Sequence, residues 1–93
     1  LQASLPAGER VAQREPLSVA VVYDAHGDYV WRCLRSLGVA PSQLDDAVQD
    51  VFVVVHQKLH DFDGACAVRT WLYAIVIRVA RKQRAQRAKH RAQ

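Results

Sequence analysis

The sequence has no methionine, two cysteines and four glycines among its 93 residues. The two cysteines are too few for a disulfide framework and form no zinc-binding pattern, which favours a reducing, cytoplasmic location. No apolar run approaches the roughly 20 residues of a membrane-spanning helix, so membrane insertion is not expected. Because the chain begins with leucine and lacks methionine, we expect an excised or processed piece of a longer protein. Its length allows one small domain.

The residue arrangements that support catalysis are also missing. The sequence has no Gly-rich phosphate loop and brings together no Ser/His/Asp or Cys/His set. Asp46 and Asp50 are one helical turn apart, but on a solvated outer face rather than beside an electrophilic site. We therefore predict neither an enzyme nor a cofactor.

Two histidines raise the question of a metal site. His56 and His60 are four residues apart, a spacing that suits two ligands on one turn of a helix. A third ligand at a useful spacing is missing, because His26 or Asp63 would have to come from elsewhere in the fold. Solvated or half-buried imidazoles are therefore favoured over a metal site.

Acidic residues are absent from the C-terminal end of the chain. Residues 78–93 carry seven of the 13 basic residues and no acidic one, whereas the other 77 residues carry six basic and nine acidic side chains. An acidic body with a basic end indicates two partners of opposite character, and nucleic acid is favoured for the basic end. The alternative is a solvated helix terminus, which the helix dipole also stabilises.

The hydrophobic pattern predicts an all-α fold, a small bundle of three main helices with a basic C-terminal helical tail. The first helix is expected to end at Gly38, the second to start at Ser42 as its N-cap, and the third to start near Ala67. The tail beyond Arg81 loses its apolar period and is expected to become helical only on binding. The domain limits predicted are a loose lead-in over 1–16, a helical domain over 17–82 and a basic linker over 83–93.

The second predicted helix carries two different surfaces. With 100° per residue, its apolar stripe contains Leu44, Val48, Val51, Phe52, Val55 and Leu59. The opposite side groups Asp46, Gln49, Asp50, Val53 and Gln57. Acid, amide and a small apolar residue together favour a docking surface for a basic partner over a merely solvated helix face.

The loop before the last helix is rich in small side chains. Residues 64–67 are Gly-Ala-Cys-Ala, which either leave room for a ligand or only connect two helices. On the helix that follows, Tyr73 and Ile77 interrupt an outer face that is otherwise basic, as expected where nucleic acid or a partner helix packs. Trp71 lies at the edge of the core stripe, where core packing is its default role and a wedge against a base pair is the alternative.

Several of these segments resemble region 2 of bacterial sigma factors, with the greatest similarity to the extracytoplasmic-function group. They are Tyr23-Asp24-Ala25-His26-Gly27-Asp28-Tyr29-Val30-Trp31-Arg32, Leu44-Asp45-Asp46-Ala47-Val48-Gln49-Asp50-Val51-Phe52, Phe62-Asp63-Gly64 and Arg69-Thr70-Trp71-Leu72-Tyr73-Ala74-Ile75. The resemblance covers residues 17–82, and it is specific because the motifs come in the family's order with similar gaps.

The resemblance implies RNA polymerase core and promoter DNA as partners. The second helix would dock on the clamp helices of the β′ subunit through Asp46, Gln49, Asp50 and Val53. The loop and last helix would recognise and melt the −10 element, holding a flipped base of the nontemplate strand. The residues expected to contact DNA are Asp63, Gly64, Ala65, Cys66, Ala67, Arg69, Trp71, Tyr73, Arg78, Arg81 and Lys82. Many family members carry a basic residue where this chain has Ala74. The resemblance also leads us to expect that the domain that reads the −35 element is missing from this piece.

Two other interpretations remain open at this point. In the first, the same surfaces mainly bind an inhibitory anti-sigma factor, and the fragment alone has negligible DNA binding. In the second, the chain is a basic-tailed DNA-binding protein without a polymerase role. The acidic and amide side chains on the second helix argue against the latter, because DNA would repel them.

Overall fold

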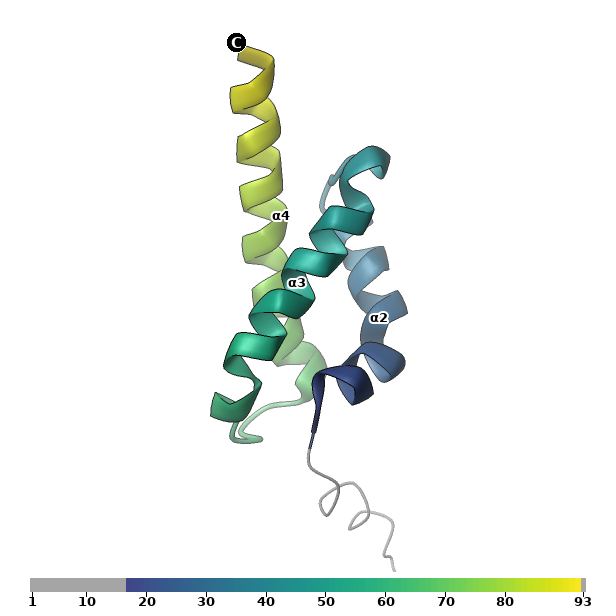
Figure 1. The fold of residues 1–93 in the computed structure, drawn as a ribbon, viewed down its shortest axis with the longest axis vertical. Coiled ribbons are helices and arrows are strands. Elements are labelled where there is room, and N and C mark those ends of the chain that lie inside the picture. Colours follow the sequence, from purple (N-terminus) through teal and green to yellow (C-terminus); the bar gives the residue numbers. More distant parts are fainter. Residues whose placement is uncertain (1–16, 93) are drawn as a thin grey trace, which may run out of the picture.

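The computed structural model describes residues 17–92, which form three α-helices and two short 3₁₀ helices and contain no strand (Figure 1). In chain order they are α2 (Val19–Ser36), η1 (Pro41–Gln43), α3 (Leu44–Lys58), η2 (Leu59–Asp61) and α4 (Val68–Ala92). The predicted all-α fold is therefore confirmed. The predicted lead-in over 1–16 lies outside the described residues. None of the described helices is long and apolar enough to cross a membrane.

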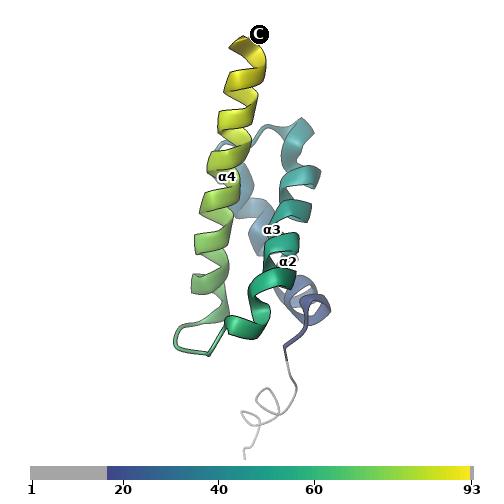
Figure 2. The same ribbon diagram turned by 60° about the vertical axis from the view of Figure 1, so that its left-hand side comes forward.

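The three α-helices run up, down and up, and each contacts the other two (Figures 1 and 2). Their core is made mostly of aliphatic side chains from all three helices, together with Phe52 of α3 and with Val39 of the connection after α2. It contains Val22, Val30, Leu34, Val39, Leu44, Ala47, Val51, Phe52, Val55, Leu72, Ile75, Val76, Val79 and Ala80. Tyr23 is 53% exposed and does not belong to this core. Its position on the flank of the α2 stripe leaves it facing the edge of α3 rather than the core.

Both ends of α2 are defined by local hydrogen bonds. The Ser18 hydroxyl accepts a hydrogen bond from the Val21 N–H at 3.1 Å and caps the N-terminus. At the other end, the N–H groups of Gly38 and Val39 donate to the carbonyls of Arg35 and Leu34. This pairing is a Schellman motif, and it places Gly38 at φ +91°.

We expect Gly38→Ala to lower the free energy of unfolding by about 1 kcal/mol, because a side chain disfavours the left-handed backbone. Space is not the cause, since an added Cβ would meet only the Arg84 side chain, at 3.9 Å. Gly27→Ala is the matched control. Gly27 lies inside α2 and its added Cβ would lie 3.6 Å from the Tyr23 ring, so this variant should be neutral or stabilising. Urea unfolding of both variants measures the difference, and equal losses would contradict the backbone explanation.

The start of α3 differs from the prediction. Ser42 is not the N-cap, since it lies inside η1, and α3 begins after Gln43 without a side-chain cap. Pro41 explains the difference, because its fixed φ starts a 3₁₀ turn in which the Gln43 N–H donates to the Ala40 carbonyl at 2.8 Å. Asp45 and Asp46 still lie in the first turn, where their charges complement the helix dipole.

Helix α4 is longer than the sequence suggested. It continues past Arg81 to Ala92 without a bound partner, and its C-terminal turns extend beyond the ends of α2 and α3 (Figure 1). Residues 81–92 are Arg, Lys, Gln, Ala and His, most of which have high helix propensity. They also extend a helix that the core has already nucleated. The domain limit predicted after Lys82 therefore falls inside a continuous helix.

Candidate functional site

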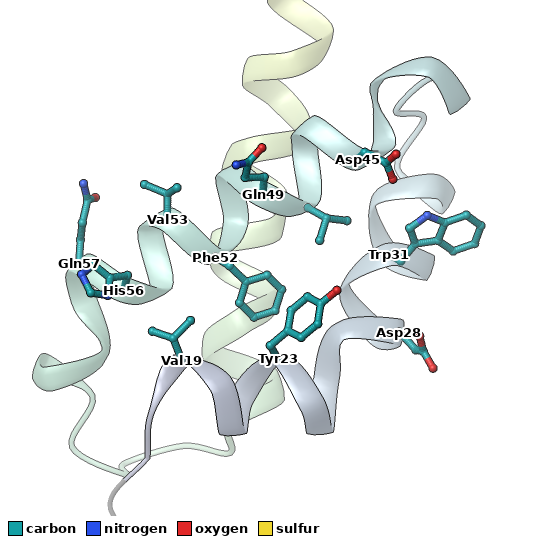
Figure 3. Close-up of a pocket in the computed structure, with 11 residues that line it drawn as sticks. Val19, Tyr23, Asp28, Trp31, Asp45, Gln49, Phe52, Val53, His56 and Gln57 are labelled. Atoms are coloured by element: carbon teal, nitrogen blue, oxygen red, sulfur yellow. The ribbon is translucent and has the colours of Figure 1, made fainter.

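An open groove of about 750 Å³ runs between α2 and α3 (Figure 3). It lies on the side of these helices that faces away from α4 (Figure 3). The residues that line it are Val19, Tyr23, Asp28, Trp31, Asp45, Val48, Gln49, Phe52, Val53, His56 and Gln57. Most of the wall is apolar or aromatic, and the two charged carboxylates lie toward one end.

Aromatic rings form the floor of the groove. The Tyr23 and Phe52 rings point toward each other with centroids 5.1 Å apart and planes at 74°, an edge-to-face contact (Figure 3). Toward the acidic end, the Arg35 guanidinium lies 5.4 Å from the centre of the Trp31 ring. An apolar floor with Asp28 and Asp45 at one end suits an amphipathic helix that carries basic residues beside its apolar face.

Three of the four residues predicted to bind polymerase are exposed on α3. Asp46 and Gln49 are exposed, and Val53, an aliphatic side chain, is 49% exposed. Gln49 and Val53 also line the groove, and Asp46 does not. The exposed apolar Val53 beside polar neighbours is therefore part of a contiguous surface with the groove.

Asp50 differs from this group, because it is turned toward α4. It is half-buried, and its Oδ2 accepts a hydrogen bond of 3.1 Å from the Gln83 amide. Gln83 itself is only 8% exposed. The prediction that Asp50 points into the same solvated face as Asp46 is thus corrected, since one oxygen of Asp50 pairs with a buried amide.

Several groove residues were not singled out from the sequence. Tyr23 and Trp31 lie eight residues apart and hence on neighbouring sides of α2, a spacing that also occurs in a core stripe. Only the presence of α3 beside them shows that they line a groove. Asp45 lies in the first turn of α3 and also lines this groove.

The loop over residues 62–67 is held by a side-chain turn and an aromatic contact. The Asp63 Oδ1 accepts a hydrogen bond from the Ala65 N–H at 2.9 Å, and Gly64 adopts φ +80°. An added Cβ at Gly64 would meet nothing within 4 Å, so the turn faces open space. Ala65, Cys66 and Ala67 are all exposed. The loop therefore presents small side chains and backbone groups to solvent on a defined turn.

Trp71 connects this loop to the core. Its ring packs on Phe62 with centroids 5.2 Å apart, and it is half-buried against the core cluster. Trp71 thus packs against the core, the role predicted as its default. The side chain is also partly exposed to solvent beside the loop.

Helix α4 carries the basic residues on exposed positions. Arg69, Arg78, Arg81 and Lys82 are exposed, as is Tyr73 at 39%. The Arg69 guanidinium carbon lies 4.5 Å from the centre of the Tyr29 ring of α2. Residues 64–93 contain no acidic side chain, so every charged side chain of α4 is basic.

The histidines do not come together with other ligands. His56 lines the groove, while His60 contacts Asp61 at 3.5 Å on an exposed turn. Within residues 17–92, no group of three or more His, Cys, Asp and Glu side chains is close enough to hold a metal ion.

The fold and these surfaces define a helical binding domain with an apolar, partly acidic groove on one side and a basic helix behind it. The Sigma-70 region 2 family matches residues 22–90, and the chain belongs to this family. The predicted resemblance to region 2 of extracytoplasmic-function sigma factors is thereby confirmed.

Two curated relatives support the assignment. The chain is 36% identical over 66 residues, 71% of its length, to the RNA polymerase sigma factor NccH of Alcaligenes xylosoxydans xylosoxydans. It is 40% identical over 50 residues, 54% of its length, to the RNA polymerase sigma factor CnrH of Cupriavidus metallidurans strain CH34. The matched segments span 36% and 26% of those two proteins. No solved structure matches the chain.

Proposed function

We propose that this chain is the part of a sigma factor that docks on RNA polymerase and recognises and melts the promoter −10 element. One observation carries the proposal: the acidic and apolar surface on α2 and α3 faces away from the basic helix α4. A protein partner and a nucleic acid can therefore bind the same small domain at once. The chain itself performs no chemistry in this proposal, since the polymerase forms the phosphodiester bonds.

The polymerase-binding surface comprises Asp46, Gln49 and Val53 together with the groove. A basic helix of the β′ clamp can place its cations near Asp46 and Asp45 while an apolar side chain covers Val53. The groove floor at Tyr23 and Phe52 supplies the apolar area that a helix–helix contact needs. Asp50 is assigned a secondary part here, because one of its oxygens is already paired with Gln83.

The DNA-binding surface comprises the loop over 62–67 and the exposed face of α4. Flipping a base out of a duplex costs a few kcal/mol of stacking and pairing, which contacts in a pocket and polymerase binding must offset. The turn at Gly64 leaves space beside it, and the exposed small side chains of the loop let a base approach the backbone. The four exposed basic residues of α4 then bind phosphates, which position the strand without reading it; they are Arg69, Arg78, Arg81 and Lys82.

Titration of the chain against a purified β′ clamp-helix fragment tests the docking half. We expect binding, and we expect Asp46→Arg to weaken it at least about 10-fold, because a like charge then faces the basic partner. Asp61→Arg is the charge-matched control, since Asp61 is exposed in η2 and does not line the groove. If the Asp46→Arg and Asp61→Arg variants bind the fragment with equal affinity, the polymerase does not bind this face of α3.

A second candidate is an interaction module whose main partner is an anti-sigma factor. The apolar lining of the groove favours it, since an inhibitory amphipathic helix would find there the same floor as the clamp helix. A folded chain that fails to bind the clamp fragment, and binds no DNA, would favour this candidate over the first.

A further inference from the structure

Helix α4 carries a row of side chains that changes from apolar to basic along the helix. Tyr73, Ile77 and Arg81 follow one another at four-residue intervals, so they lie along one side of α4. Tyr73 is 39% exposed, Arg81 is exposed and Ile77 is half-buried. Arg84, which is also exposed, continues the row by one turn. This α4 row therefore begins with two apolar side chains and ends with two arginines.

The groove between α2 and α3 has the complementary order. Its floor is the edge-to-face pair of Tyr23 and Phe52, and the carboxylates of Asp28 and Asp45 lie toward one end (Figure 3). A helix that offers apolar side chains and then cations matches an apolar floor that is followed by carboxylates. The α4 row and the groove thus fit each other in both polarity and charge.

We propose that the α4 row of one copy of this chain docks in the groove of a second copy. A chain cannot place its own α4 there, because the groove opens on the side of α2 and α3 that faces away from α4 (Figure 3). The two surfaces are different, so the contact is heterologous and leaves one groove and one α4 row free at the ends of a pair. The inference goes beyond the proposed function, since it concerns the protein without polymerase or DNA.

The distribution of charge along the chain favours this arrangement over a symmetric dimer. Residues 78–93 carry seven basic residues and no acidic one, whereas the other 77 residues carry six basic and nine acidic residues. A head-to-tail contact places the arginines of one copy beside the carboxylates of the next. A contact between two identical surfaces would instead bring like charges together, which costs free energy.

The association is expected to be weak and to compete with the clamp helices. Helix α4 contributes two large apolar side chains, Tyr73 and Ile77, far fewer residues than the roughly 20–30 per partner of a stable interface. Gln49 and Val53 line the groove, so a copy whose groove is covered cannot present them to the polymerase. Self-association would therefore hold the protein in a form that does not dock.

Sedimentation of the wild-type chain at low salt is the first test. The weight-average mass should rise with protein concentration, and it should return toward that of the monomer at about 0.5 M salt, where the ion pairs are screened. Adding the clamp-helix fragment should also dissociate the assembly. A chain that stays monomeric at every concentration at low salt would overturn the inference.

Two variants test the contact itself. Val53→Asp alters the groove and Tyr73→Asp alters the α4 row, and each alone should weaken self-association at least about 10-fold, because a carboxylate is then buried without a cation. An equal mixture of the two should form a pair that grows no further, since one variant keeps its α4 row and the other its groove. Val21→Asp is the matched control, because Val21 is also an exposed valine, at 44%, but does not line the groove. Circular dichroism checks that each variant folds.

The outcomes separate this inference from the proposed function. A mixture that stays monomeric while the wild type associates would show that the contact does not join the groove to the α4 row. Equal losses in Val21→Asp and Val53→Asp would also contradict it. A chain that self-associates as described but does not bind the clamp fragment would overturn the docking half of the proposed function alone. A chain that binds the fragment but stays monomeric would overturn this inference alone.

Discussion

Raising the salt concentration from about 50 to 200 mM is expected to weaken binding of single-stranded DNA to this chain about 50-fold. Each phosphate contact releases a condensed counterion, and for single strands the logarithm of the affinity falls with the logarithm of salt by about 0.7 per contact. Four exposed basic residues of α4 are predicted to contact phosphates, which gives a slope of about −2.8. They are Arg69, Arg78, Arg81 and Lys82.

The slope can be divided among these residues. A triple variant in which Arg78, Arg81 and Lys82 are each replaced by glutamine should have a slope that is less steep by about 2, because three contacts are lost. Glutamine keeps the helix propensity of these positions, so α4 should remain intact by circular dichroism. Fluorescence anisotropy with a labelled strand at several salt concentrations measures both slopes.

The double variant Arg35→Gln and Lys58→Gln is the control. Both residues are exposed and basic, and they lie at the ends of α2 and α3 rather than on α4. Replacing them changes the net charge but none of the proposed phosphate contacts, so the slope should stay near that of the wild type. A triple variant with an unchanged slope would show that the α4 cations do not contact phosphates.

The fold was predictable because its signals are local. The apolar period of 3.6 residues identifies all three helices, and Ser18 and Gly38 mark both ends of the first. The start of α3 was misassigned because Ser42 has the right residue type, while Pro41 before it imposes a 3₁₀ turn. The end of α4 was misassigned because the apolar period stops near Arg81, whereas helix propensity continues.

The candidate site was only partly predictable, because part of it is formed by contacts between helices that are far apart in the sequence. Motif spacing identifies the loop and the exposed residues of α3. The groove, by contrast, brings Tyr23 beside Phe52, and the packing of α4 on α2 brings Arg69 beside Tyr29, across some 30 to 40 residues of sequence. Asp50 is only about 40° from Asp46 around α3, yet that rotation turns it from solvent toward α4.

Asp50→Ala is expected to lower the free energy of unfolding by about 1–3 kcal/mol. The Gln83 side chain is 8% exposed, and its amide donates to the Asp50 carboxylate at 3.1 Å. Removing the carboxylate leaves a buried donor without its partner, and the cost is the desolvation of that donor. Asp46 is exposed, and removing its carboxylate leaves no buried donor unpaired. Asp46→Ala should therefore change the free energy of unfolding by less than about 0.5 kcal/mol. Urea unfolding curves measure both changes.

Replacing both members of the pair separates this explanation from a general effect of Asp50 on α3. Gln83→Leu fills a similar volume and removes the buried amide, so in the Asp50→Ala background it should restore most of the lost stability. The double-mutant cycle should give a coupling energy of about 0.5–3 kcal/mol. Additive losses would show that the two side chains do not stabilise each other.

The same cycle decides how an Asp50 variant is to be interpreted in polymerase binding. If Asp50 acts mainly by holding α4 against α3, Asp50→Ala should weaken clamp binding only as far as it unfolds the domain, and Gln83→Leu should restore binding together with stability. A direct contact with the clamp predicts the opposite, because restoring the packing cannot replace a missing carboxylate. We expect the first result, since Gln83 already occupies one oxygen of Asp50 and Asp46 is the exposed carboxylate. Binding that stays lost in a double variant of restored stability would reassign Asp50 to the polymerase surface.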